Sequence, residues 1–333
     1  MKKTLLIFSF FFLILLSAFI QLTPTRWTKS TPLAKVLVLL GEPKPSHYLE
    51  NWDTNKAKIG EELFFKGQST SSNGKKSHRI SKHYVCSNCH NTTKETQILT
   101  DITPKSRLQY ASQTGIPFLQ GSTMFGVVNR TQWYNGDYKK KYGDLVIPAQ
   151  DTLVNAIQLC ARECSQGRLL EKWELEALLN YFWSLQITLG DLNFNEEEWF
   201  LIQEKSDSAI VLIQSKYSLF SNATFTPALS LEKRTYGENG LAENGKVIYN
   251  QSCLHCHHPK QRITNLKLED NKLSHQLLKS MLKKTSEMSV YEIVRRGTNP
   301  IAGYKPYMPH YTQEKLSNQQ IEDLVAYINK KCD

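Results

Sequence analysis

The sequence predicts an all-α fold of two helical modules in tandem, behind an N-terminal membrane anchor or signal segment. The pattern C-x-x-C-H occurs at residues 86–90 and again at 253–257. Apolar residues recur at helical spacing before and after each copy. An uncharged apolar run, residues 4–22, precedes both. The expected boundaries are 1–26 for the anchor or signal, 27–190 for the first module, 191–235 for a connector and 236–333 for the second module.

The apolar run at the N-terminus is long enough to cross a bilayer. It follows Lys2 and Lys3, and as a helix it extends about 28 Å, close to the thickness of the hydrocarbon layer. The positive flank should remain in the cytoplasm, which sends the rest of the chain to the periplasmic side of the cytoplasmic membrane. A cleaved signal peptide is the alternative, and it predicts the same side.

The segments that precede the two motifs follow one plan. Gly60 lies four residues before Phe64 ahead of the first motif, and Gly245 lies four residues before Tyr249 ahead of the second. Residues four apart share one face of a helix. Each motif is therefore expected to follow a helix that carries a glycine and an aromatic residue on the same face.

A second helical segment follows each motif, at residues 173–185 and 321–329. The later one is preceded by Ser317 and Gln320, whose spacing is that of a capping box. Each segment carries a leucine and a tyrosine three apart on its inner face: Leu178 with Tyr181, and Leu324 with Tyr327. The connector contains a shorter helical stretch at 196–205.

The C-x-x-C-H spacing is that of covalent c-type haem attachment. Two cysteines three apart form thioethers to the two vinyl groups of one haem, and the adjacent histidine becomes the proximal iron ligand. The alternative is a C-x-x-C zinc or redox site, and two copies in matching contexts favour haem. The sequence thus predicts a dihaem cytochrome with two covalently attached haem c groups. Its attachment residues would be Cys86, Cys89 and His90, and Cys253, Cys256 and His257.

The two motifs with their flanking helices resemble the class I cytochrome c fold. In that family the first and last helices cross, and a small residue on one helix admits an aromatic residue of the other. The resemblance implies that Met308, in Tyr307-Met308-Pro309, is the distal ligand of the second haem. Met281 and Met288 are the alternatives in this module. The segment 291–297 resembles the short helix that precedes the ligand loop.

The first module has no Met-Pro before its last helix, so its distal ligand stays open. The segment 156–170 resembles thiosulfate dehydrogenases and the A subunit of sulfur-oxidising Sox cytochromes. In that resemblance Cys160 falls at the cysteine that binds iron as a thiolate, and Gly167 and Leu170 fall at the glycine and leucine that follow. The alternatives are Cys164, Met124 and His83. We also expect a disulfide between Cys332 and whichever of the two cysteines does not bind iron.

The favoured function is electron transfer between respiratory partners. The partners expected are quinol-oxidising complexes, terminal oxidases or other cytochromes, met at the membrane. The formal net charge of +10 favours acidic partner surfaces or anionic lipid, and the scattered lysines do not indicate nucleic acid. The alternative is a sulfur-compound oxidoreductase with Cys160 at its catalytic site. A dihaem peroxidase ranks third because no acid–base pair for peroxide cleavage is identifiable.

Overall fold

The computed structural model describes residues 26–205, 207–220, 222–282, 288–298 and 307–332. The predicted anchor or signal segment, residues 4–22, lies outside these ranges. Within them, none of the helices combines the length and the apolar character that a membrane crossing requires.

Helices supply the regular structure of the described ranges. The earlier ones are α2 (Leu33–Leu39), α3 (Thr54–Lys66), α4 (Pro104–Thr114), α5 (Lys139–Tyr142), α6 (Ile147–Asp151), α7 (Leu153–Leu159) and α8 (Lys172–Ser184). The later ones are α9 (Glu196–Gln203), α10 (Asp207–Gln214), α11 (Ala242–Ile248), α12 (Leu254–His257), α13 (Lys272–Leu282), α14 (Val290–Arg296) and α15 (Asn318–Lys330). Single π-helical turns follow α7 and α11, at Cys160–Cys164 and Tyr249–Cys253.

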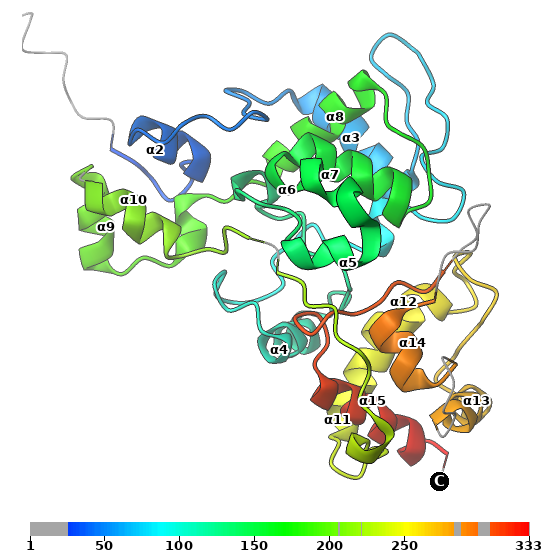
Figure 1. Cartoon of the computed structure of the whole chain (residues 1–333). Helices are drawn as coiled ribbons and strands as arrows, with labels where there is room; N and C mark the ends of the chain where they lie inside the picture. The colour runs from blue at the N-terminus through cyan, green and yellow to red at the C-terminus, as the bar shows by residue number, and fades with distance from the viewer. Residues whose placement is uncertain (1–25, 206, 221, 283–287, 299–306, 333) are drawn as a thin grey trace, which may run out of the picture.

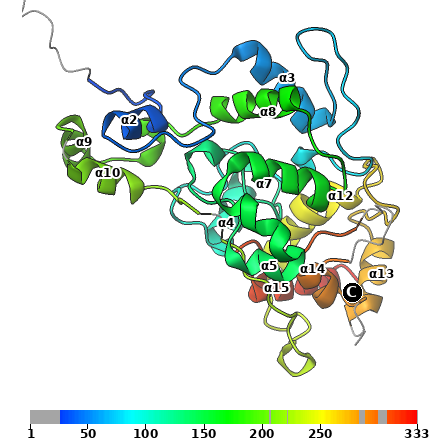
Figure 2. The same ribbon diagram turned by 45° about the horizontal axis from the view of Figure 1, so that its top comes forward.

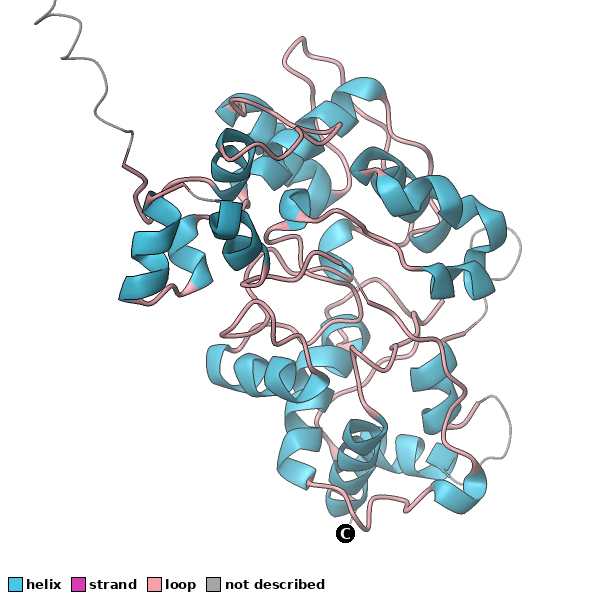
Figure 3. Ribbon diagram, turned by 60° about the vertical axis from the view of Figure 1, so that its left-hand side comes forward, coloured by secondary structure: helices cyan, strands magenta, loops and turns pink. Residues whose placement is uncertain are grey.

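The all-α prediction is confirmed for the described part of the chain. Figure 3 shows helices joined by loops, and the β-pairing consists of isolated bridges, Pro32 with Thr188 and Thr70 with Lys76. The capping box is also present, because the main-chain N–H of Gln320 donates to the Ser317 hydroxyl and that of Ser317 donates to the Gln320 side chain (3.1 and 3.0 Å).

Helices α3 and α8 cross at Gly60, as the sequence predicted (Figures 1 and 2). A Cβ placed on Gly60 would lie 2.1 Å from the carbonyl oxygen of Ala177 and 2.8 Å from the Cβ of Tyr181. Both distances are far shorter than a van der Waals contact. The two helices can approach this closely only because Gly60 has no side chain.

Helices α11 and α15 cross in the same way at Gly245. A Cβ at this position would lie 2.0 Å from the carbonyl oxygen of Asp323 and 2.7 Å from the Cβ of Tyr327. Glycine on the earlier helix and tyrosine on the later one therefore meet at both crossings. The structure contains two helix pairs built on the same close contact.

A separate apolar core surrounds each crossing. The first core includes Leu63, Phe64, Leu153, Leu178 and Trp183. The second core includes Ile248, Tyr249, Tyr291, Leu324 and Ile328. A smaller third cluster joins α2 to the connector helices α9 and α10 through Leu33, Val36, Ile202 and Ile213. Each fully buried aliphatic or aromatic side chain contributes about 1.5–3 kcal/mol.

Helix α4 packs away from the core of its own predicted module. It lies between the first motif and α8 in the sequence, yet Leu108, Ala111 and the nearby Phe118 belong to the second core (Figure 1). The side chain of Gln251 donates to the carbonyl oxygen of Ala111 (3.0 Å). The segment around α4 therefore links the two cores.

Candidate haem-binding sites

A large cavity lies in the first core, with about 1450 Å³ of empty volume that includes open solvent at its mouth. Its walls come from the first motif, α3, the segment 120–142, the end of α7 and the segment 307–312. The structure thereby brings together residues that the sequence singled out separately: Cys86, Cys89, His90, Met124, Cys160 and Cys164. His83 is not among the lining residues.

The first motif has the form of a haem attachment site. Burial raises the pKa of the Cys86 thiol to about 12 and raises that of Cys89 further. Both cysteines keep partial solvent exposure and both line the cavity, so they face its interior. A cavity lined by protonated thiols and apolar side chains fits the porphyrin of haem c, which would be bound through these two sulfurs.

His90 lines the cavity with one ring nitrogen held by the backbone. Its Nδ1 lies 2.7 Å from the carbonyl oxygen of Ser122, so Nδ1 carries the proton and Nε2 is left to bind a metal. Gly121 makes this approach possible, because a Cβ there would lie 2.6 Å from Nδ1. Burial lowers the pKa of His90. Burial therefore favours the neutral imidazole, the form that iron ligation requires.

The second motif repeats this arrangement. Cys253 ends a π-helical turn, and Cys256 and His257 lie in α12. The Nδ1 of His257 lies 3.0 Å from the carbonyl oxygen of Leu266, and burial lowers the pKa of His257. This histidine also presents Nε2 as the free nitrogen.

Cys160 and Cys164 face the first cavity from the π-helical turn after α7. Cys160 donates a hydrogen bond to Cys164. This bond is the largest cause both of the raised pKa of Cys160 and of the lowered pKa of Cys164. The hydroxyl of Tyr142 is 3.1 Å from the sulfur of Cys164, and that of Tyr134 is 3.8 Å away. Isolated π-turns recur at functional sites. Here the turn supplies a sulfur pair with the charged form favoured at Cys164.

Met124 lies on the side of the cavity that holds His90. Its main-chain N–H donates to the carbonyl oxygen of Asn91 (2.7 Å), the residue after His90. The hydroxyl of Thr123 donates to the same oxygen (3.1 Å). These bonds fix the Met124 backbone beside His90.

The predicted disulfide of Cys332 is wrong. All seven cysteines lie in the described ranges, and none of them forms a disulfide. Cys160 and Cys164 line the cavity of the first core, whereas Cys332 follows α15 in the second. The separation of the two cores keeps these thiols apart.

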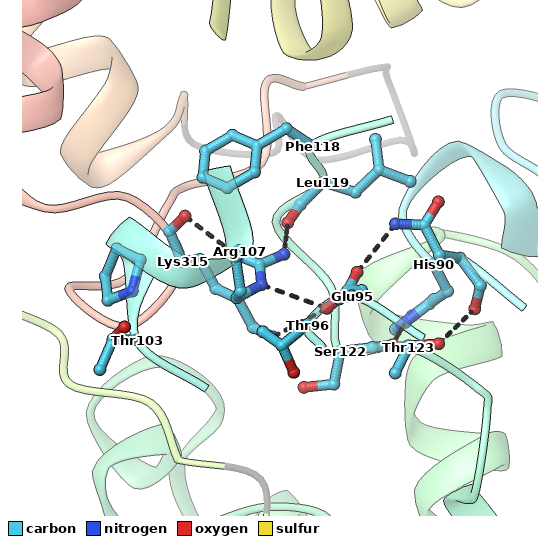
Figure 4. Close-up of polar contacts among 12 residues, drawn as sticks. His90, Glu95, Thr96, Thr103, Arg107, Phe118, Leu119, Ser122, Thr123 and Lys315 are labelled. Atoms are coloured by element: carbon cyan, nitrogen blue, oxygen red, sulfur yellow. Dashed lines mark hydrogen bonds and ion pairs between the residues drawn. The ribbon is translucent and has the colours of Figure 1, made fainter. Parts of the chain in front are cut away.

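A buried cluster of charges lies beside His90 (Figure 4). The carboxylate of Glu95 is 3.2 Å from the Nε of Arg107 and 3.9 Å from the Nζ of Lys315. Arg107 also donates to the carbonyl oxygens of Leu119 and Lys315 (2.8 and 3.0 Å). Burial lowers the pKa of Lys315 to about 7. The sequence carried no signal for this cluster, because its members are far apart along the chain.

Arg130 is a half-buried cation that lines the first cavity. It also lines a neighbouring pocket with about 690 Å³ of empty volume, again counting open solvent. Its Nη2 donates to the carbonyl oxygen of Thr123 (3.0 Å), and within the described ranges its guanidinium forms no ion pair. Burial lowers the pKa of Arg130 to about 10. A half-buried guanidinium on the cavity wall without a carboxylate fits a haem propionate, which would complete the pair.

Met308 packs against the second core, as does the alternative Met281. The main-chain N–H of Met308 donates to the hydroxyl of Thr298 (2.8 Å), and the N–H of Thr298 donates back to the Met308 carbonyl (2.9 Å). Met288, the other alternative, is 54% exposed. The segment 299–306, which precedes Met308, lies outside the described residues.

The two C-x-x-C-H motifs lie against each other. The Nε2 of His255, inside the second motif, is 3.3 Å from the carbonyl oxygen of Ser87, inside the first. Around them, the main-chain N–H of Phe118 donates to the carbonyl oxygen of Gln251 (3.0 Å), and Phe118 accepts a hydrogen bond from Ser252.

Residues 240–328 match a family model described as cytochrome C oxidase, cbb3-type, subunit III. The match supports a c-type cytochrome domain over α11 to α15, and such a domain implies covalently bound haem c and haem-based electron transfer. The second motif and Met308 fall within it. No curated protein and no solved structure matched the chain.

Proposed function

We propose that this protein is a dihaem c-type cytochrome that passes electrons between two covalently bound haems. One would be attached at Cys86 and Cys89, and the other at Cys253 and Cys256. The contact between His255 and Ser87 carries the proposal, because it brings the two attachment motifs together. Electron tunnelling falls steeply with distance, so motifs in contact favour rapid exchange between their haems.

The residues of the chain set the direction of flow. When bound, haem iron supplies reversible one-electron chemistry. A thioether from Met308 would favour the reduced iron and so give a high potential at the second site. A thiolate from Cys160 or Cys164 would favour the oxidised iron and so give a lower potential at the first. Electrons would then pass from the first site to the second.

The partners in this proposal are other redox proteins on the periplasmic side of the membrane. The family matched by residues 240–328 takes its name from an oxidase, so oxidases, quinol-oxidising complexes and other cytochromes are the candidates. The apolar run at residues 4–22 would act as an anchor that raises the local concentration of the cytochrome near such partners.

Haem counting tests the proposal directly. The wild type, a Cys86→Ala/Cys89→Ala variant and a Cys253→Ala/Cys256→Ala variant would be produced in a periplasm that attaches haem c. The pyridine haemochrome assay, normalised to protein, should give two haems for the wild type and one for each variant. Cys332→Ala is the matched control and should keep both. A wild type with a single haem would overturn the proposal.

A second candidate function is a sulfur-compound oxidoreductase, which the resemblance of residues 156–170 suggests. The observation that favours it is the pair of Cys160 and Cys164 in the first cavity, with hydroxyl donors around Cys164. Either sulfur in its thiolate form would be the catalytic group.

Electron paramagnetic resonance and turnover separate these candidates. The oxidised wild type should show a low-spin thiolate-ligated species, which Cys160→Ser abolishes if Cys160 is the ligand and Cys164→Ser abolishes if Cys164 is. Turnover with thiosulfate or tetrathionate in the wild type, lost in the same variant, would establish the enzyme. A thiolate species without turnover would leave the carrier, and a spectrum without thiolate would return the ligand to Met124.

A further inference from the structure

The segment that carries Met308 runs between the two cores and is bound from both sides. On the side of the second core, the peptide of Met308 exchanges two hydrogen bonds with Thr298. Gly297 lies directly against it, since a Cβ there would be 2.4 Å from the Met308 carbonyl oxygen. This side is built from residues of the matched cytochrome domain.

The other side is built by the first haem-binding site. The hydroxyl of Tyr84 accepts a hydrogen bond from the main-chain N–H of Tyr307 (2.7 Å) and donates one to the carbonyl oxygen of the same residue. Tyr84 is two residues before Cys86 and only 4% exposed. The rings of Tyr84 and Tyr307 also meet edge to face, with centroids 5.9 Å apart.

Two further contacts tie this segment to the first site. The hydroxyl of Tyr307 donates to the carbonyl oxygen of Cys164 (2.7 Å). Two residues beyond Met308, the Nδ1 of His310 lies 2.7 Å from the Nζ of Lys141. The residue before Met308 and the residue after Pro309 are thus both bonded to walls of the first cavity.

We propose that Tyr84 is a positioning residue for the axial methionine of the second haem, supplied from the attachment segment of the first. The inference rests on the proposed function, in which Met308 binds the second iron. By bonding both main-chain polar groups of Tyr307, Tyr84 sets the conformation of the residue that leads into Met308. The direction in which the Met308 side chain leaves the backbone follows from it.

The effect on ligation comes from preorganisation. A flexible loop loses conformational entropy when its methionine binds iron, whereas a loop already bound in place loses little. Tyr307 is only 9% exposed, so its main-chain groups have little water to replace Tyr84. Through the bond from Tyr307 to Cys164, the same segment also connects the sulfur pair of the first site to the methionine of the second.

Competition with imidazole measures this preorganisation, because imidazole must displace methionine to bind the ferric iron. The experiment uses the haem-loaded full chain and follows the red absorption band of methionine-ligated ferric haem. Tyr84→Phe removes both hydrogen bonds to Tyr307 and keeps the ring. We expect the apparent dissociation constant of imidazole at the second haem to fall about tenfold, since two buried hydrogen bonds no longer support the methionine-bound state.

Tyr249→Phe is the matched control. Tyr249 is a buried tyrosine of the second core whose hydroxyl donates to the carbonyl oxygen of Glu269 (2.8 Å), away from the Met308 segment. It should lose a similar amount of thermal stability without any change in imidazole affinity. An equal change in both variants would show a merely structural role and overturn the proposal, as would an unchanged affinity in Tyr84→Phe.

A second measurement, on the wild type, keeps the test decisive if Tyr84→Phe does not load haem. The main-chain N–H of Tyr307 donates to the Tyr84 hydroxyl, so in the haem-loaded protein this amide should be strongly protected from hydrogen exchange. Exchange of the Tyr307 amide at the rate of a solvent-exposed amide would overturn the proposal. If Met308 does not bind the second iron, the result looks different, because the wild type itself would lack the absorption band of methionine-ligated ferric haem. The haem count would still test whether the protein carries two haems.

Discussion

Replacing Gly245 by alanine tests the packing on which the second core depends. The new Cβ would lie 2.0 Å from the carbonyl oxygen of Asp323, against 3.4 Å for an ordinary contact, so α11 and α15 must separate by about 1.4 Å. Overpacking of this kind costs up to about 3 kcal/mol. The higher helix propensity of alanine returns about 1 kcal/mol. The net destabilisation is therefore about 2 kcal/mol.

Thermal unfolding of the haem-loaded protein, followed by far-ultraviolet circular dichroism, measures this loss. At about 2–4 °C per kcal/mol, Tm should fall by about 4–8 °C. Gly60→Ala should give a similar decrease, because its Cβ would lie 2.1 Å from the carbonyl oxygen of Ala177. Gly136→Ala is the control, with no atom within 4 Å of the added Cβ. Wild-type melting of Gly245→Ala would refute the reasoning.

Three further predictions concern the buried charges beside the first site. Burial lowers the pKa of Lys315 to about 7 from its ordinary 10.5. Between pH 7 and pH 10.5 the folded state therefore binds fewer protons than the unfolded chain, so the free energy of unfolding should rise with pH. Lys315→Met should flatten that rise in denaturant titrations, and an unchanged slope would contradict the lowered pKa of Lys315. Glu95→Gln leaves Arg107 buried without its carboxylate and should cost about 3–5 kcal/mol in urea unfolding, whereas Glu243→Gln, which breaks an exposed pair, should cost less than about 1 kcal/mol. Arg130→Met removes a cation from the cavity wall and should lower the midpoint potential of the first haem in a spectroelectrochemical titration, and an unshifted potential would place Arg130 away from the haem.

The features that the structure confirms are local ones. The C-x-x-C-H spacing predicts haem attachment, because covalent haem chemistry needs two thiols and a histidine within one turn, and the matched cytochrome domain supports this prediction for the second motif. Gly60 and Gly245 were found from their spacing to an aromatic residue, and the helix crossings followed from the resemblance that this pattern suggested. Helical periodicity and a capping box similarly located α8 to within one residue and α15 to within three.

The features that only the tertiary structure decided are contacts between distant segments. The packing of α4 in the second core, the bond between His255 and Ser87 and the separation of Cys332 from Cys160 all depend on how the two cores face each other. Periodicity along one helix states which side is apolar, but not which of two apolar cores that side will join. The chain alone therefore determined where the two C-x-x-C-H motifs lie, whereas the packing of the two cores decided that these motifs touch and that Tyr84, beside the first motif, binds the segment that carries Met308.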